Sequence, residues 1–280
     1  MRIDLHTHSV ASDGTEPPEV VVAEAARAGL DVVALTDHDT TAGWAVAETA
    51  ALRHGVALVR GAELSCRAEG TSVHLLAYLH DPADAGLLAE ADRVRASRAG
   101  RAQEIVRRLA ADYPVTWDDV LAQTGPDATV GRPHIADALV ALGVLPDRSA
   151  AFTSLLTQDS PYYVQHYATD LVEAVRLVLA AGGVPVMAHP GASSRGRVLS
   201  DAAVRAAADA GLAGLEVDHR DHSPEQRARL AALAAELGLL VTGSSDYHGL
   251  GKPNLLGENT TAPSVLAAIA ERGRLAVVGP

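Results

Sequence analysis

Short runs of β-branched and aliphatic residues alternate along the chain with longer, alanine-rich stretches that have helical periodicity. The runs predict strands at residues 2–5, 31–35, 57–59, 73–78, 183–188, 214–217 and 239–242, with an edge strand at 275–278. Helices are predicted between them, over residues 17–28, 41–54, 170–181, 200–210, 224–237 and 263–272. Such alternation indicates an α/β fold in which crossover helices connect a parallel sheet, closed as a barrel.

One stretch interrupts the alternation. Residues 81–165 contain no convincing strand, only predicted helices at 84–111, 117–123, 132–142 and 147–156. We therefore expect a barrel formed by residues 1–80 and 166–280, with residues 81–165 as a helical insertion that acts as a lid. The insertion is rich in arginine, and we interpret these side chains as a solvated helix face rather than a basic stripe: Arg93, Arg95, Arg98, Arg101, Arg107 and Arg108.

Composition narrows the class of protein. The chain has 280 residues and a single cysteine, Cys66, which excludes a disulfide framework and fits a reducing compartment. We see no secretory leader and no apolar stretch long enough for a bilayer, so a cytoplasmic protein without membrane or protein partners is expected. A net charge of −12 and an aromatic content of 3% argue against a general nucleic-acid coat, although not against a small anionic substrate.

The 12 histidines carry the chemistry. His6 and His8 follow the first strand with a spacing that places both imidazoles on one side of an extended chain. Further histidines and carboxylates are expected at or near the ends of later strands: Asp13, His38, Glu63 after the third strand, His74 at the start of the fourth, His189, Asp246 and His248. Barrel active sites are built at the carboxyl ends of the strands. Nine ligands at this end are too many for one ion, so the pattern predicts a centre with more than one metal ion. Mixed imidazole and carboxylate ligands suit zinc, manganese or iron.

The same series of motifs resembles the polymerase and histidinol phosphatase (PHP) family. The resemblance implies a distorted (β/α)7 barrel with a helical insertion, two to three divalent ions (Mn²⁺, Fe²⁺ or Zn²⁺) and cleavage of phosphoesters. Carried over by position, it implies a first ion on His6, His8, Glu63 and Asp246, a second on Glu63, His74 and His189, and a third on Asp13, His38 and His248. Asp13 stands where some members have histidine, which favours a harder third ion.

Charge supports a phosphate substrate. Three divalent ions, three carboxylates and a bridging hydroxide leave a net charge of about +2, which matches a phosphomonoester dianion. We therefore expect direct attack by a metal-bridging hydroxide without a phosphoenzyme, with His6, His8, Glu63, Asp246 and Arg197 as the catalytic residues.

Candidate substrate contacts lie outside this series. Gly131-Arg132-Pro133-His134 opens a predicted helix, either as an anion site or as a simple cap. This motif, Pro161-Tyr162-Tyr163-Val164 and residues 181–191 resemble the nucleotide-acting branch of the family, which includes 3′,5′-nucleoside bisphosphate phosphatases and 5′→3′ exoribonucleases. The candidates are Arg132, His134, Ser193, Arg197 (preferred over Arg195) and His222. The roles of four further residues stay open. Tyr162 or Tyr163 is a candidate for stacking on a base, His219 is a candidate for an ordinary loop histidine, and Lys252 lies either at the surface or at the phosphate.

The leading hypothesis is a metal-dependent phosphoesterase that removes the 3′-phosphate of a nucleoside 3′,5′-bisphosphate. A 5′→3′ exoribonuclease acting on short RNA and a histidinol phosphate phosphatase are the alternatives within this chemistry. Other classes are a non-catalytic, metal-binding regulatory module and an amidohydrolase. The complete ligand series favours an enzyme.

Overall fold

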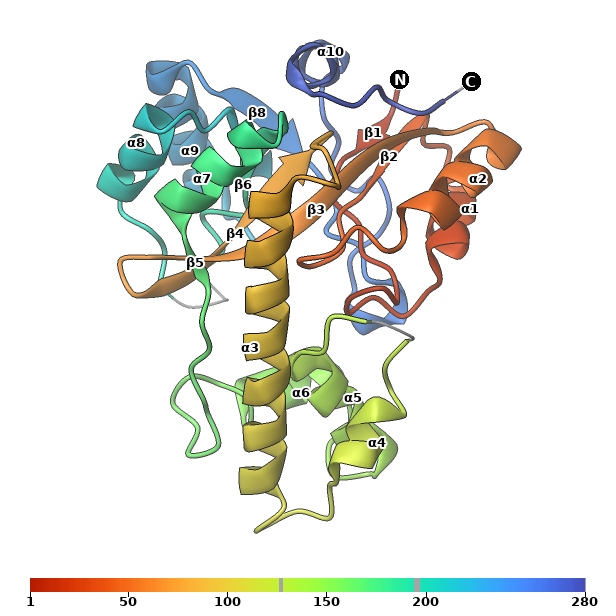
Figure 1. Ribbon diagram of the computed structural model, residues 1–280, viewed down its shortest axis with the longest axis vertical. Coiled ribbons are helices and arrows are strands. Elements are labelled where there is room, and N and C mark those ends of the chain that lie inside the picture. The colour runs from red at the N-terminus through yellow and green to blue at the C-terminus, as the bar shows by residue number, and fades with distance from the viewer. Residues whose placement is uncertain (126–127, 194–196, 280) are drawn as a thin grey trace.

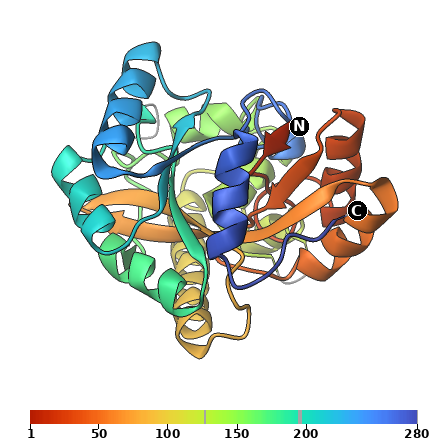
Figure 2. The same cartoon turned by 90° about the horizontal axis from the view of Figure 1, so that it is seen from above.

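The computed structural model describes residues 1–125, 128–193 and 197–279. Its sheet curls into a nearly closed barrel (Figure 1, Figure 2). The strand order is β1 (Ile3–Asp4), β2 (Val32–Leu35), β3 (Ala57–Ala68), β4 (Thr71–Tyr78), β6 (Val184–Ala188), β7 (Gly214–Asp218) and β8 (Leu240–Gly243), with β5 (Thr169–Asp170) beside β3. A bridge between Thr7 and Tyr247 joins the segments that follow β1 and β8. The predicted distorted barrel is confirmed.

The sheet is not wholly parallel, and here the prediction was wrong. β4 runs antiparallel to both β3 and β6. Glu69 and Gly70 link β3 to β4 with φ angles of 50° and 74°, and a two-residue turn of this kind joins antiparallel strands. β3 also continues to Ala68, far beyond its predicted end, whereas residues 275–278 contribute only an isolated bridge between Leu58 and Val278.

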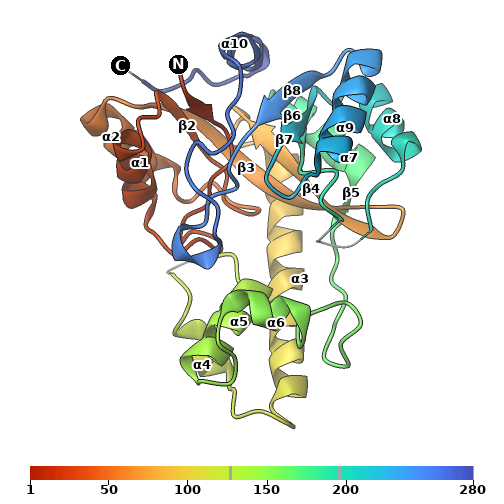
Figure 3. The same ribbon diagram turned by 180° about the vertical axis from the view of Figure 1, so that it is seen from behind.

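Helices surround the barrel and bury its apolar strands. α1 (Pro18–Arg27) and α2 (Trp44–His54) pack beside β2 and β3, while α7 (Leu171–Ala180), α8 (Asp201–Asp209) and α9 (Pro224–Leu237) cover the side of β6 and β7 (Figure 3). α10 (Pro263–Arg272) crosses the amino-terminal end of the barrel (Figure 2), where Leu266 and Ile269 join the core that contains Ile3. These helices agree closely with the predicted ones.

The remaining helices lie at the opposite end of the barrel (Figure 1, Figure 3). They are α3 (Ala85–Leu109), α4 (Trp117–Leu121), α5 (Arg132–Ala141) and α6 (Arg148–Thr153), and they share an apolar core of their own. We propose that residues 81–165 form an insertion over the carboxyl ends of the strands. Arg98 and Arg101 of α3 are only 5% and 7% exposed, so the interpretation of these two as a solvated face was wrong. No helix in the described part of the chain is long and apolar enough to span a bilayer.

Candidate active site

The strand ends bring the predicted ligands together. His6 and His8 follow β1, His38 follows β2, His189 follows β6, and Asp246 and His248 follow β8. Glu63 does not follow its strand as predicted but lies in the middle of β3, because β3 continues past the barrel edge into the hairpin. His74 lies near the start of β4, and the antiparallel direction of this strand brings that end to the same edge.

Backbone strain accompanies this placement. Asp39, His189 and Asp246 have φ angles of 53°, 30° and 55°, a region that residues other than glycine adopt only at some cost in free energy. Two predicted ligands and Asp39, the neighbour of a third, thus carry the strain, and the surrounding hydrogen bonds must hold them in this conformation. The backbone N–H of His189, for example, donates to Glu216 Oε2 at 2.8 Å.

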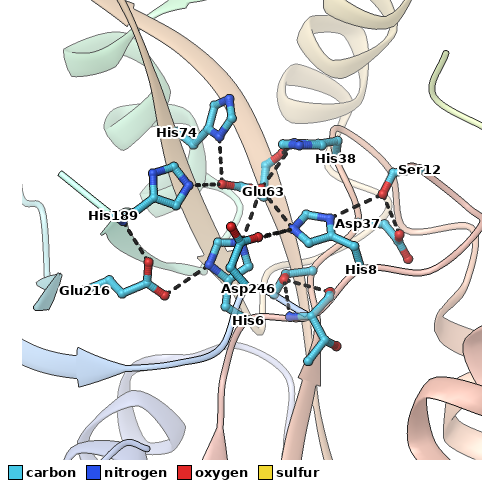
Figure 4. Close-up of polar contacts among 12 residues, drawn as sticks. His6, His8, Ser12, Asp37, His38, Glu63, His74, His189, Glu216 and Asp246 are labelled. Carbon is cyan, nitrogen blue, oxygen red and sulfur yellow. Dashed lines mark hydrogen bonds and ion pairs between the residues drawn. The ribbon is translucent and has the colours of Figure 1, made fainter. Parts of the chain in front are cut away.

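Glu63 lies at the centre of the cluster (Figure 4). Its Oε2 is 3.2 Å from His6 Nε2, 3.1 Å from His8 Nε2 and 3.3 Å from His38 Nδ1. Its Oε1 is 2.8 Å from His74 Nδ1 and 3.0 Å from His189 Nε2. One carboxylate therefore contacts two sets of imidazoles through its two oxygens.

The nine predicted ligands form overlapping groups. His6, His8, Glu63 and Asp246 each offer a ligand atom, and all four atoms lie within 4.8 Å of one another. His74 and His189 share Glu63 Oε1. Asp13 lies 3.2 Å from His248 Nε2 and 3.7 Å from His38 Nε2. The first predicted set is one of these groups, whereas the other two among the described residues are His8, Asp13 and His38, and His38, Glu63 and His74.

Outer carboxylates orient the imidazoles, and the sequence analysis missed them. Glu216 of β7 contacts His6 Nδ1 at 3.0 Å, which leaves His6 Nε2 facing the cluster. Ser12 Oγ lies 3.3 Å from His8 Nδ1 and donates to Asp37 at 2.6 Å. Such partners fix ring orientation and tautomer at metal sites. Glu216 could have been found as the acidic residue inside the buried run Gly-Leu-Glu-Val.

The donor set fits divalent metal ions. His6 and His8 are fully buried, Glu63 and Asp246 are 1% exposed, and their nitrogen and oxygen atoms converge on a shared space. His248 donates from Nδ1 to the carbonyl oxygen of Asp246 at 2.8 Å, so its buried Nε2 faces the cluster, 3.2 Å from Asp13 Oδ1. Buried imidazole and carboxylate groups in such proximity suit divalent metal ions.

In the metal-free cluster, attraction between imidazoles and carboxylates shifts the pKa values of both. Burial disfavours the charged form of His8, but Asp246 and Glu63 outweigh it and raise the pKa of His8 to about 9. Burial opposes ionisation of Glu63 as well, yet His74, His6 and His38 together hold the pKa of this carboxyl well below its usual range. Without an ion, the cluster therefore retains protons that a metal must displace.

A pocket of about 910 Å³ opens from this cluster toward α3, α5 and α6. Part of its wall consists of predicted metal ligands, among them Asp13, Glu63 and His74, and another part is cationic, with Arg98, Arg101, Arg132 and Arg148. The cluster of predicted metal ligands and a group of arginines thus share one cavity.

The arginines of this wall differ in their partners. Arg148 pairs with Asp137, and Arg98 lies 3.4 Å from Asp39 and donates to Ser65 Oγ at 2.6 Å.

Arg101 and Arg132 have no carboxylate partner among the described residues. Arg101 donates to His166 Nδ1 at 3.0 Å, and Arg132 donates to the carbonyl oxygen of Leu156 at 2.8 Å. Burial, together with the like charges of Arg132 and Arg98, lowers the pKa of Arg101. Buried arginines without a carboxylate partner are suited to bind an anionic ligand.

The other predicted substrate contacts are placed differently. His134 accepts the backbone N–H of Gly131 at 3.1 Å and is buried as a helix cap. Both ring nitrogens of His222 contact backbone, Nδ1 at Val217 O and Nε2 at the N–H of Gly191. Ser193 is exposed and accepts from Gln226. None of these three side chains lines the pocket.

Arg197 lines the outer wall of the pocket, where its guanidinium donates to Thr71 Oγ1 at 2.9 Å and to the carbonyl oxygen of Glu69 on the β3–β4 hairpin. Arg195 lies outside the described residues. Tyr162 packs on Tyr113 and donates to Asp112, and neither Tyr162 nor Tyr163 lines the pocket. Cys66 is fully buried.

Two residues that the sequence left open lie beside Asp246. His219 is fully buried, with Nε2 3.6 Å from Asp246 Oδ2. Lys252 Nζ lies 2.8 Å from the same oxygen. Both belong to loops that follow strands, and no spacing rule in the sequence assigns them to the cluster.

Comparisons with known proteins agree with the barrel and the cluster. A family model described as PHP domain matches residues 4–112. The chain is 35% identical to the 3′,5′-nucleoside bisphosphate phosphatase of Chromobacterium violaceum, covering 89% of this chain and 88% of that protein. It is 34% identical to the 5′-3′ exoribonuclease of Haemophilus influenzae, covering 88% and 90%.

A solved structure from Bifidobacterium adolescentis, described as a metal-dependent phosphoesterase, is 47% identical and superposes with a TM-score of 0.95. The match covers 97% of this chain and 96% of that one. Fold, cluster and relatives together define a metal-dependent phosphoesterase. The chain belongs to the PHP family.

Proposed function

We propose that the protein removes the 3′-phosphate from a nucleoside 3′,5′-bisphosphate. The carrying observation is that Arg101 and Arg132, which have no carboxylate partner among the described residues, share a pocket with the ion cluster. A substrate with two anionic groups suits this arrangement, since one group lies at the cluster and the other meets the arginines. The Chromobacterium violaceum relative is named a 3′,5′-nucleoside bisphosphate phosphatase, which supports the substrate class.

In this proposal His6, His8, Glu63 and Asp246 hold one ion. Glu63 with His74 and His189 holds a second, and Asp13 with His38 and His248 holds a third. Manganese, iron and zinc all suit these ligands. When bound, the ions supply Lewis acidity toward phosphate oxygens and lower the pKa of coordinated water.

The chain's own groups perform the remaining tasks. Glu216 and the Ser12–Asp37 pair keep the His6 and His8 rings turned toward the ions. Arg101 and Arg132 would bind the 5′-phosphate through charge-assisted hydrogen bonds and so fix the distance between the two phosphates. No serine, cysteine or lysine nucleophile is required, which is consistent with direct attack by water.

A second candidate is a 5′→3′ exoribonuclease that acts on short RNA. The Haemophilus influenzae relative favours it, and a 5′-phosphorylated strand also presents two successive phosphates. The experiment that separates the two compares adenosine 3′,5′-bisphosphate, 5′-AMP, histidinol phosphate and a short 5′-phosphorylated RNA with manganese-loaded enzyme. Preferential release of phosphate from the bisphosphate supports the proposal, whereas consumption of the RNA alone assigns the site to the exoribonuclease.

A further inference from the structure

Lys252 is the chain's only lysine, and it lies at the ion cluster. Its Nζ is 2.8 Å from Asp246 Oδ2, and the residue lines the pocket. The side chain is 28% exposed, so it reaches the cavity rather than being sealed behind the ligands. All other basic residues counted with it are arginines.

The loop that carries Lys252 is held firmly. Leu250 donates from its backbone N–H to Thr15 Oγ1 at 2.8 Å, and the Asn254 amide donates to the carbonyl oxygen of Ser245 at 2.6 Å. A Cβ on Gly249 would lie 2.3 Å from Thr15 Oγ1, and one on Gly251 would lie 2.3 Å from Arg148 Nη1. Close packing on both sides therefore fixes the direction of the lysine side chain.

The two oxygens of Asp246 face different groups. Oδ1 lies 3.5 Å from His6 Nε2 and 3.4 Å from His8 Nε2, whereas Oδ2 faces Lys252 and His219. A cation next to a metal ligand repels a divalent ion and withdraws charge from the carboxylate. Lys252 thus disfavours binding of the ion, and a favourable interaction with another group must offset this cost.

An anion that binds beside the ions supplies this favourable interaction. We propose that Lys252 is a further phosphate-binding residue, whose ammonium donates to a non-bridging oxygen of the phosphate held at the ion cluster. One of its protons contacts Asp246 Oδ2, and the others are available to the ligand. The inference rests on the proposed ion site and on the phosphoesterase chemistry, and it does not depend on which nucleotide is the substrate.

The first test measures two affinities in K252M and K252R, with inorganic phosphate and Mn²⁺ as probes. Loss of the ammonium in K252M is expected to weaken product inhibition by phosphate about 10-fold or more. Calorimetry on the metal-free protein is expected to give Mn²⁺ affinity equal to or tighter than that of the wild type, because a repulsive charge is gone. K252R restores part of the phosphate affinity, and thermal melting verifies that both variants fold.

R220M is the matched control, because Arg220 lines the same pocket but lies 3.6 Å from Glu258 rather than beside Asp246. It removes the same charge and is expected to change phosphate inhibition less than 3-fold. If R220M and K252M weaken inhibition by phosphate equally, loss of positive charge anywhere in the pocket explains the result, and the proposal is overturned. A fall in Mn²⁺ affinity in K252M also overturns it, since Lys252 would then position the ligand Asp246.

A second test exploits the single lysine. Reductive methylation modifies the N-terminal amine and Lys252, and peptide mass spectrometry quantifies each. Phosphate with Mn²⁺ is expected to protect Lys252 at least 5-fold while the N-terminal amine reacts as before. Equal reaction of Lys252 with and without phosphate overturns the inference. This outcome is separate from failure of the proposed function, because a protein that rejects every nucleotide can still show phosphate protection.

Discussion

His74 Nδ1 lies 2.8 Å from Glu63 Oε1, and the two residues belong to adjacent antiparallel strands. In the register of this pair His74 faces Ser65, two residues beyond Glu63, so both side chains point from the same face of the sheet. The turn at Glu69-Gly70 fixes that register. The hairpin, rather than a strand end, therefore brings His74 to the carboxylate that the proposed ion sites share.

The first prediction concerns Glu63. E63Q replaces a carboxylate with a neutral amide, whose nitrogen cannot bind metal, and should empty both sites that Glu63 joins. Activity should fall at least about 100-fold, beyond the ~10- to 100-fold typical of outer partners. Elemental analysis of the purified variant checks metal content. Normal metal content together with normal turnover would contradict the assignment of Glu63.

Glu216 should act through His6. E216Q keeps the shape of the side chain but offers one acceptor oxygen where Glu216 accepts from both His6 Nδ1 and the backbone N–H of His189. We expect metal affinity or activity to fall about 10- to 100-fold. Calorimetric titration of the metal-free variant with Mn²⁺ measures this loss. E225Q is a suitable control, because Glu225 is exposed at the start of α9, and it should bind Mn²⁺ like the wild type.

Arg132 should discriminate between substrates. Each charge-assisted hydrogen bond to a phosphate contributes about 1.5–3 kcal/mol, so R132A should raise KM for adenosine 3′,5′-bisphosphate about 10- to 100-fold. A phosphomonoester without a second phosphate should be affected far less. Steady-state kinetics on both substrates tests the difference, with R197A as the comparison, since Arg197 is engaged by the β3–β4 hairpin. Equal effects of R132A on both substrates would make Arg132 structural.

Metal binding should release protons. In the metal-free cluster the pKa of His8 is raised to about 9, so this imidazole is largely protonated at pH 7.5 and must lose its proton to bind an ion. The apparent metal affinity should therefore rise with pH up to about 9 and fall as the solution becomes more acidic. Calorimetry in buffers of different ionisation enthalpy counts the protons. No release at pH 7.5 would mean that the imidazoles are already neutral in the metal-free protein.

The strand–helix alternation predicted the barrel, and the His-x-His and Asp-x-His motifs predicted residues that the structure brings together in the cluster, because both signals are local. The β3–β4 hairpin was missed because Glu69-Gly70 was not recognised as a turn that reverses the chain, and Glu63 was therefore placed beyond its strand. Arg98 and Arg101 were misjudged because helical periodicity does not reveal which partner covers a charged face. Glu216 and Lys252 reach the cluster only through tertiary contacts.

In the proposed function, the scissile 3′-phosphate lies at the ion cluster while Arg101 and Arg132 bind the 5′-phosphate. Identifying the mononucleotide that manganese-loaded enzyme forms from adenosine 3′,5′-bisphosphate, by ³¹P NMR or chromatography against both standards, tests it most directly. We predict stoichiometric 5′-AMP and inorganic phosphate. Formation of 3′-AMP, or no phosphate release from enzyme whose metal content is complete, would contradict the account.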